Sequence, residues 1–189
     1  MIRFSLVMAT RGRTTEIAEF LDSLLAQGRE DAECIIVDQN DDDRLDALLA
    51  PYAGRLRLAH RRSAIANANH ARNLGLREAV GEIVAFPDDD CLFPPGTLAM
   101  VDKAFADAPA LMVLTGPAAS PEGGLGSGRW RDSRGAITDE NVWTSVIEFN
   151  LWLRRPVALA MGGFDEGMGP GTPIGSAEGN DLVLRDRKS

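Results

Sequence analysis

Ile83-Val84-Ala85-Phe86-Pro87-Asp88-Asp89-Asp90-Cys91 is the stretch that decides the fold, because four apolar residues run directly into three successive carboxylates. An apolar run that contains Val and Ile and is bounded by turn residues predicts a buried strand. Gly81 stands just before the run, and Pro87 ends its ladder pairing. The acidic triplet therefore follows the carboxyl end of a central strand, the edge where ligands bind in an open α/β sheet.

The acidic triplet has two interpretations. Adjacent carboxylates repel one another, and hard dications such as Mg²⁺ or Mn²⁺ prefer oxygen ligands and often bridge a carboxylate to a substrate phosphate. Asp88, Asp89 and Asp90 are therefore candidate metal ligands. The alternative is a solvated acidic loop that caps a helix starting near Pro95. The triplet alone does not choose between them.

Composition limits the classes of function. A chain of 189 residues suits one domain with a sizeable core, and 44% apolar with 25% charged residues is ordinary for a soluble globular protein. The net charge of −8 argues against a nucleic-acid partner, since a phosphate backbone demands a basic surface. An anionic substrate must instead meet local positive charge.

Cellular location is predicted from the cysteines and the apolar runs. Cys34 and Cys91 lie in or beside expected strands, which favours reduced, structural thiols in a reducing compartment. Residues 1–5 enter a strand and lack the features of a secretory signal, and no apolar run approaches the ~18–20 residues of a membrane span. We expect a cytoplasmic protein.

Alternating strand and helix patterns predict the architecture. Strands are expected at 4–8, 34–37, 56–60, 83–86 and 111–114, and helices at 17–25, 45–49, 65–80, 98–105 and 177–185. This order predicts an α/β fold with a mostly parallel sheet and helices on both of its faces. The second part is less regular: residues 117–139 look like a long mobile loop, and 142–153 are expected to hold an antiparallel strand or a short helix.

Five segments in order carry a resemblance to a known family. They are Ala9-Thr10-Arg11, Ile35 to Asn40, Ala71-Arg72-Asn73-Leu74-Gly75, Phe86 to Asp90 with Pro94, and Gly162 to Glu166 followed by Glu178, Asp181-Leu182 and Arg185. In this order and spacing they resemble the family-2 glycosyltransferases of the GT-A fold. The resemblance runs from Phe4 to about Arg185, nearly the whole chain.

The resemblance implies a fold and an activity. The fold is GT-A, a Rossmann-like sheet, with residues 1–116 as the nucleotide-sugar-binding half that carries the metal motif. Residues 117–189 form a smaller acceptor-side region of the same domain. The implied reaction moves a sugar from a nucleoside diphosphate donor to a hydroxyl of a glycan, polysaccharide or lipid-linked acceptor, with inversion. Relatives usually continue past this point with helices that complete the acceptor site or reach a membrane. A natural minimal version, a truncated copy and peripheral association with the inner face of a membrane therefore all stay open.

The resemblance also implies roles for single residues. A Mn²⁺ or Mg²⁺ ion is held by Asp88 and Asp90, with Asp89 as a third candidate, and it neutralises the departing diphosphate. Glu178 is the first candidate for the general base that inversion needs, and Asp181 is the second. Donor contacts are expected from the turns after the first two strands, the helix motif and the triplet: Ala9, Thr10, Arg11, Asp38, Gln39, Arg72, Asp88 and Asp89.

Two positions differ from the family pattern, and two alternatives remain. Gln39 stands where the family has a base-recognising acid, so the nucleotide base need not be uracil, because an amide both donates and accepts. Gly179 stands where a second acid commonly follows Glu178.

One alternative is a non-catalytic nucleotide-sugar-binding module of the same fold. The other is a nucleotidyltransferase, which would want a longer Gly-rich basic loop than residues 9–13 provide.

Overall fold

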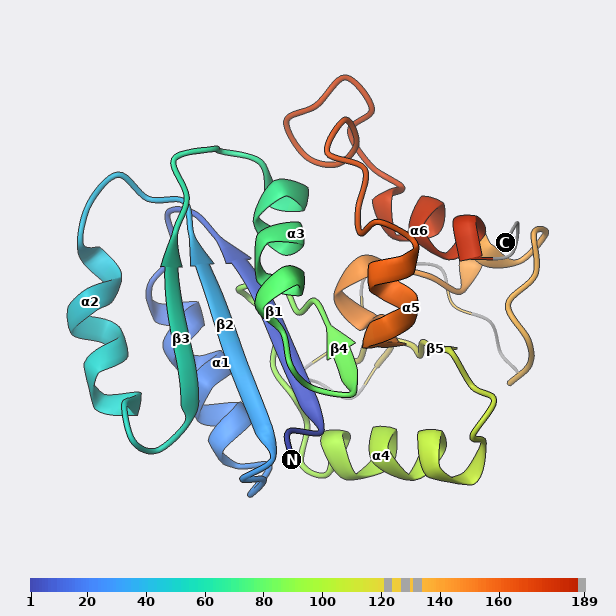
Figure 1. The fold of residues 1–189 in the computed structure, drawn as a ribbon, viewed down its shortest axis with the longest axis horizontal. Coiled ribbons are helices and arrows are strands. Elements are labelled where there is room, and N and C mark those ends of the chain that lie inside the picture. The colour runs from blue at the N-terminus through green and yellow to red at the C-terminus, as the bar shows by residue number, and fades with distance from the viewer. Residues whose placement is uncertain (121–123, 127–129, 131–133, 187–189) are drawn as a thin grey trace.

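The sheet has six strands in a computed structural model that describes residues 1–120, 124–126, 130 and 134–186. Their spatial order is β3-β2-β1-β4-β6-β5 (Figure 1). The strands are β1 (Phe4–Thr10), β2 (Ala32–Asp38), β3 (Arg57–Arg62), β4 (Ile83–Ala85), β5 (Val113–Leu114) and β6 (Trp152–Arg154). The helices are α1 (Thr15–Leu25), α2 (Arg44–Leu49), α3 (Ala68–Glu78), α4 (Thr97–Asp107), α5 (Arg155–Ala160) and α6 (Glu178–Asp186). Three 3-10 turns add η1 (Ala50–Tyr52), η2 (Val142–Thr144) and η3 (Glu148–Asn150).

The predicted, mostly parallel α/β sheet is confirmed. Strand β1 pairs in parallel with β2 and β4, and β2 pairs in parallel with β3. Strand β6 runs antiparallel between β4 and β5, so the 142–153 stretch supplies the antiparallel strand that was one of its two expected forms. Helix α5 follows β6 directly and was not expected from the sequence. Because β6 lies between β4 and β5, the two regions of the chain share one sheet.

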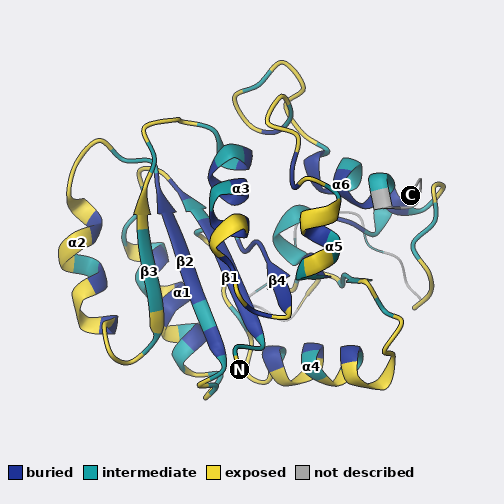
Figure 2. Cartoon of the chain, viewed as in Figure 1, coloured by how far each residue is buried: buried dark blue, intermediate teal, exposed yellow. Residues whose placement is uncertain are grey.

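Alternating side chains of the central strands fill two hydrophobic layers. Phe4, Leu6 and Met8 of β1 point into a cluster that includes the apolar stripes of α1 and α4. Val7 points to the opposite face, into a cluster with residues of α3, α5 and α6. Strands β1, β2 and β4 are buried along most of their length (Figure 2). Helices therefore cover both faces, as predicted.

Helix α3 lies directly on the sheet, and its position sets up the site. The helix begins after Asn67, whose side chain accepts a hydrogen bond from the backbone N–H of His70 at 2.9 Å. At Gly75 an added Cβ would overlap Cγ1 of Val7 on β1, so only glycine allows this close approach. Arg72, one turn earlier, is thereby held near the carboxyl ends of the strands.

The carboxyl ends of the parallel strands meet at one edge. Thr10 and Asp38 are register partners, and the backbone N–H groups of Gln39 and Ser63 continue the ladder to the carbonyl oxygens of Thr10 and Asp38. The loops after β1, β2, β3 and β4 therefore gather at this edge.

The predicted loop at 117–139 lies partly outside the described residues, since 121–123, 127–129 and 131–133 are not described. Its described part contains one isolated bridge, between Ala119 and Leu125. Within the described ranges, none of the helices has the length and hydropathy that a membrane span requires.

Candidate active site at the carboxyl edge of the sheet

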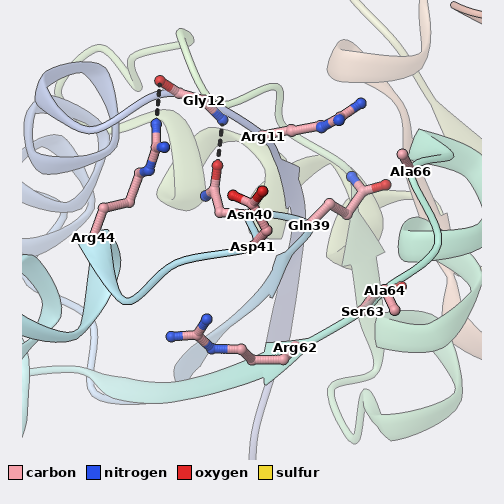
Figure 3. Close-up of a pocket in the computed structure, with 10 residues that line it drawn as sticks. All are labelled: Arg11, Gly12, Gln39, Asn40, Asp41, Arg44, Arg62, Ser63, Ala64 and Ala66. Carbon is pink, nitrogen blue, oxygen red and sulfur yellow. Dashed lines mark hydrogen bonds between the residues drawn. The ribbon is translucent and has the colours of Figure 1, made fainter.

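A pocket of about 530 Å³ opens between the loops after β1, β2 and β3. Figure 3 shows its wall, with the side chains of Arg11, Arg44 and Arg62 coming from three different segments. Arg44 forms an ion pair with Asp42, and Arg62 forms ion pairs with Asp43 and Asp46. Arg11 adds local positive charge of the kind that an anionic ligand needs. The lining residues are Arg11, Gly12, Gln39, Asn40, Asp41, Arg44, Arg62, Ser63, Ala64 and Ala66.

The turn after β2 is built around the buried carboxylate of Asp38. Its Oδ1 accepts hydrogen bonds from the backbone N–H and the side-chain amide of Asn40, at 2.8 and 2.7 Å. Its Oδ2 lies 3.0 Å from Nε2 of His60. Asn40 in turn accepts a hydrogen bond from the N–H of Gly12 at 2.7 Å, which joins the first two loops (Figure 3). Asp38 thus does not line the pocket, but its hydrogen bonds hold Asn40, which does.

Gln39 reaches the pocket itself. Its Oε1 accepts a hydrogen bond from the backbone N–H of Asn67 at 2.7 Å, which ties the second loop to the start of α3. The amide nitrogen of Gln39 is the donor that this side chain can offer to a ligand. Arg11 also lines the pocket, whereas Ala9 packs against the hydrophobic cluster on the α3 face.

The first residue of the acidic triplet is held by a buried arginine. Asp88 lies just beyond β4, and its Oδ1 accepts a hydrogen bond from Nη2 of Arg72 at 2.9 Å. Burial raises the pKa of Asp88, while the charge of Arg72 opposes that rise. A carboxylate in this setting is stabilised by added positive charge.

The other two carboxylates face a different arginine. Asp89 accepts a hydrogen bond from Oγ1 of Thr10 at 2.6 Å, and its other oxygen lies 3.0 Å from Nε of Arg13. Asp90 pairs with Nη2 of Arg13 at 2.8 Å. Burial also raises the pKa of Asp89. The helix-cap interpretation of the triplet has no support here, since α4 follows Gly96 without a side-chain cap.

The donor set of the triplet fits a hard dication, because it offers several carboxylate oxygens at one sheet edge. In this structure the three carboxylates do not converge on a common point. Among the described residues, no three His, Cys, Asp or Glu side chains converge as metal ligands. A dication binding between Asp89 and Asp90 would have to displace the guanidinium of Arg13.

Arg72 connects the triplet to the acceptor-side region. It is 5% exposed, and its Nη1 donates to Oδ1 of Asn69 at 2.9 Å and lies 3.4 Å from Oε1 of Glu178. Its guanidinium also stacks 5.4 Å from the ring centroid of Phe164. One buried cation therefore contacts both Asp88 after β4 and Glu178 at the start of α6.

Of the two base candidates from the sequence, only Glu178 reaches this centre. Glu178 is buried against Arg72, whereas Asp181 forms an ion pair with Arg185 at 2.9 Å on α6. Arg185 also donates to the carbonyl oxygen of Gly163 at 2.6 Å. Through this ion pair and hydrogen bond, Asp181 and Arg185 hold α6 against the turn at 162–166.

Glu148 is a residue of this centre that the sequence reasoning missed. It begins η3, and burial together with the charge of Glu178 raises its pKa, while Arg72 has the opposite effect. Its signal in the sequence was faint: it is the single charged residue of the aromatic-rich stretch 142–151. Only the fold shows that this stretch lies beside α6.

The two cysteines take no part in this centre. Both are free, and burial raises the pKa of each thiol to about 12. Neither is therefore a thiolate nucleophile at neutral pH, in agreement with the structural role expected from the sequence.

The sheet order, the two helical layers and the polar carboxyl edge define a GT-A-type α/β fold. The chain belongs to the family described as "Glycosyl transferase family 2", which it matches over residues 5–159. That match covers the pocket, the triplet and Arg72, and it ends before Glu178.

Individual relatives agree with this assignment. An "Uncharacterized glycosyltransferase" of Rickettsia felis is 30% identical over 93 residues, which is 48% of this chain and 15% of that protein. TarS of S. aureus superposes with a TM-score of 0.75 at 22% identity, over 98% of this chain and 33% of TarS. The mannosyltransferase PcManGT from Pyrobaculum calidifontis, solved with GDP-Man and Mn²⁺, gives 0.73 at 22% identity, over 97% of this chain and 51% of that one. The chain therefore spans well under two thirds of each of these proteins.

Proposed function

We propose that this chain transfers a sugar from a nucleoside diphosphate donor to an acceptor hydroxyl, with inversion at the anomeric carbon. The observation that carries the proposal is the meeting of three features at one sheet edge. These are the arginine-lined pocket, the acidic triplet after β4, and Arg72, which joins the triplet to Glu178. Family membership favours sugar transfer over nucleotidyl transfer.

The donor is proposed to bind with its nucleoside in the pocket and its diphosphate toward the triplet. Arg11 and Gln39 contact the nucleotide, while Asp38 and Ala9 shape the wall from behind. Thr10 holds Asp89 in place. TarS has been solved with UDP-GlcNAc and PcManGT with GDP-Man, so nucleotide sugars of two kinds are reasonable probes.

A Mn²⁺ or Mg²⁺ ion is proposed to be held by Asp88 and Asp90, with Asp89 as the third ligand. When bound, such an ion acts as a Lewis acid that neutralises the charge of the departing diphosphate. The role of Arg72 is to hold Asp88 in place and to add positive charge at the same end of the pocket. Arg13 pairs with Asp89 and Asp90, so an ion held by these carboxylates competes with its guanidinium.

The acceptor is proposed to approach from the side of α6 and the turn at 162–166. A carbohydrate or lipid-linked hydroxyl must lose its proton as it attacks, so a carboxylate has to lie on this side. Glu178 and Asp181 are the candidates that the sequence supplies, and Glu178 is the one that contacts Arg72. The two free cysteines suit a cytoplasmic location for the reaction.

Titration calorimetry with UDP-GlcNAc and with GDP-mannose, each with and without Mn²⁺, tests the proposal. We expect one of these donors to bind only when Mn²⁺ is present, and we expect Asp88→Asn to weaken that binding at least tenfold. Asp107→Asn is the matched control, because Asp107 is an exposed aspartate on α4 that pairs with Lys103. If neither donor binds the wild-type chain under any condition, the proposal fails.

A second function has one observation in its favour. Gly179 leaves α6 without the second acid that commonly follows Glu178 in the family, which suits a module that binds a nucleotide sugar without transferring it. Release of nucleoside diphosphate from the bound donor separates the two functions. A binding module holds its donor intact, whereas a transferase releases the nucleotide in the presence of an acceptor or water.

A further inference from the structure

The close contact between α6 and η3 places Glu148 where a side chain at position 179 would begin. A Cβ added to Gly179 would lie 2.9 Å from the backbone N of Glu148 and 3.2 Å from its Cβ. Ordinary Cβ contacts are longer than these distances, so the two backbones exclude any side chain at 179. Glu148 is therefore the residue at this contact whose side chain can carry a carboxylate.

Three described carboxylates, Glu148, Glu178 and Asp181, belong to the packed pair of η3 and α6, and they differ in their contacts. Glu178 is 2% exposed; its Oε1 lies 3.4 Å from Nη1 of Arg72 and 3.0 Å from the Cβ position of Gly169. Asp181 is tied to Arg185 at 2.9 Å. A base must come within hydrogen-bond reach of an external hydroxyl, and both of these groups already pair with an arginine.

Within the described residues, Glu148 differs from Glu178 and Asp181 in forming no ion pair with an arginine within 4.0 Å. It is half-buried, and its backbone N and Cβ lie against Gly179 of α6. Its charged neighbours come from each element packed around it: Glu178 of α6, Arg72 of α3 and Asp88 after β4. Burial, Glu178 and Asp88 raise the pKa of Glu148, and Arg72 lowers it, so the group holds a proton more tightly than an exposed glutamate does.

We propose that Glu148 is the catalytic base of the transfer and that Glu178 is a positioning residue that fixes Arg72. In this step the acceptor O–H gives its proton to the carboxylate of Glu148, and the acceptor oxygen bonds to the anomeric carbon. The bond from that carbon to the diphosphate oxygen breaks, and its electron pair leaves with the nucleoside diphosphate. The inference rests on the proposed function above. It places the general base on η3, whereas the sequence predicts it at the start of α6.

The test uses water as the acceptor, so that the natural acceptor is not needed. Release of UDP from UDP-GlcNAc and of GDP from GDP-mannose is followed with Mn²⁺, for the wild-type chain, Glu148→Gln and Glu178→Gln. Glu148→Gln should lower kcat by roughly 10²- to 10⁴-fold, the range of a general base, and leave the donor Kd within about twofold. Glu178→Gln should instead weaken donor binding, because it removes one of the two carboxylates that pair with Arg72. Glu30→Gln, at an exposed position on the loop before β2, is the control.

Chemical rescue separates a base from a structural residue. Formate added to Glu148→Ala should restore part of the release rate, because a small carboxylate can enter the space and take the proton, whereas a folding defect is not repaired. If Glu148→Gln releases nucleotide at the wild-type rate, the inference is wrong and the proposed function stands. The same conclusion follows if Glu148→Gln loses donor binding. A wild-type chain that binds neither donor contradicts the proposed function itself, and one that binds a donor but releases no nucleotide contradicts both.

Discussion

At the scale of single residues, Arg13 is the cation that pairs with the second and third carboxylates of the acidic triplet. Its guanidinium lies 3.0 Å from Asp89 and 2.8 Å from Asp90, and the triplet raises its pKa further. A dication binding at the same carboxylates must compete with this cation. Partly exposed pairs are worth up to about 1 kcal/mol each, so Arg13→Ala should tighten Mn²⁺ binding by roughly three- to tenfold.

Calorimetric titration of Mn²⁺ in the absence of nucleotide measures this effect. Arg61→Ala is the control, since Arg61 forms a comparable ion pair with Glu78 away from the triplet. Unchanged or weaker Mn²⁺ binding in Arg13→Ala would show that the ion does not take the place of this arginine.

Glu148 offers a second prediction at this scale, in the pH dependence of stability. Its pKa is raised in the folded chain, so its contribution to stability is complete below the unfolded pKa and is lost as the pH rises through the folded pKa. A glutamine cannot ionise and avoids that loss. Urea unfolding should therefore find Glu148→Gln more stable than wild type at pH 8, with a smaller difference at pH 5. A difference that is the same at both pH values would argue against a perturbed Glu148.

At the scale of secondary-structure elements, the contact of α3 with β1 fixes the site. A Gly to Ala change inside a helix normally adds helix propensity worth about 1 kcal/mol. At Gly75 the new methyl group would overlap Val7, so we expect the opposite sign. Gly75→Ala should destabilise the fold by roughly 1–3 kcal/mol, as overpacked cores do.

Urea denaturation of Gly75→Ala, with and without Val7→Ala, isolates the cause. If the overlap is responsible, the cost of Gly75→Ala should fall when the Val7 side chain is shortened. Gly116→Ala is the control, because an added Cβ there meets nothing within 4 Å. A cost that does not depend on residue 7 would assign the effect to another contact.

The elements that the sequence predicted well are those with a long pattern. Strands β1 and β2 each have seven residues and mostly apolar composition, and α1 shows apolar residues at helical spacing, so period and length identify them. Strands β5 and β6 have two and three residues, too few for any period to show, and their pairing is set by distant partners. Helix α5 has six residues and begins with Arg155-Pro156, a start that resembles a turn.

The residues of the candidate site also fall into two groups, those with a local sequence pattern and those that depend on long-range contacts. The acidic triplet and the Arg72 motif are local in sequence and could be proposed as site residues from the sequence alone. The burial of Asp38 behind the pocket wall, the link from Arg72 to Glu178 and the position of Glu148 depend on contacts between residues far apart in the chain. Such contacts leave no local pattern to detect.

At the scale of the whole molecule, the site draws on both regions of the chain, so ligand binding should stabilise the fold as a unit. The pocket and triplet come from residues 9–90, while Glu148 and Glu178 come from the region that contributes β6 to the shared sheet. A ligand at one hundred times its Kd adds about 2.7 kcal/mol, which for a chain of this size corresponds to roughly 5–10 °C in Tm.

We therefore expect one cooperative thermal transition whose Tm rises by that amount with Mn²⁺ plus the nucleoside diphosphate that binds. Differential scanning calorimetry with UDP and with GDP, each with and without Mn²⁺, measures it. Asp88→Asn should lower the shift to about half or less, because it removes the carboxylate that Arg72 orients, whereas Asp107→Asn should keep it. Two separate transitions, with only the lower or the upper one shifted by ligand, would mean that residues 117–189 unfold independently of the donor half, and the shared sheet would not couple the two.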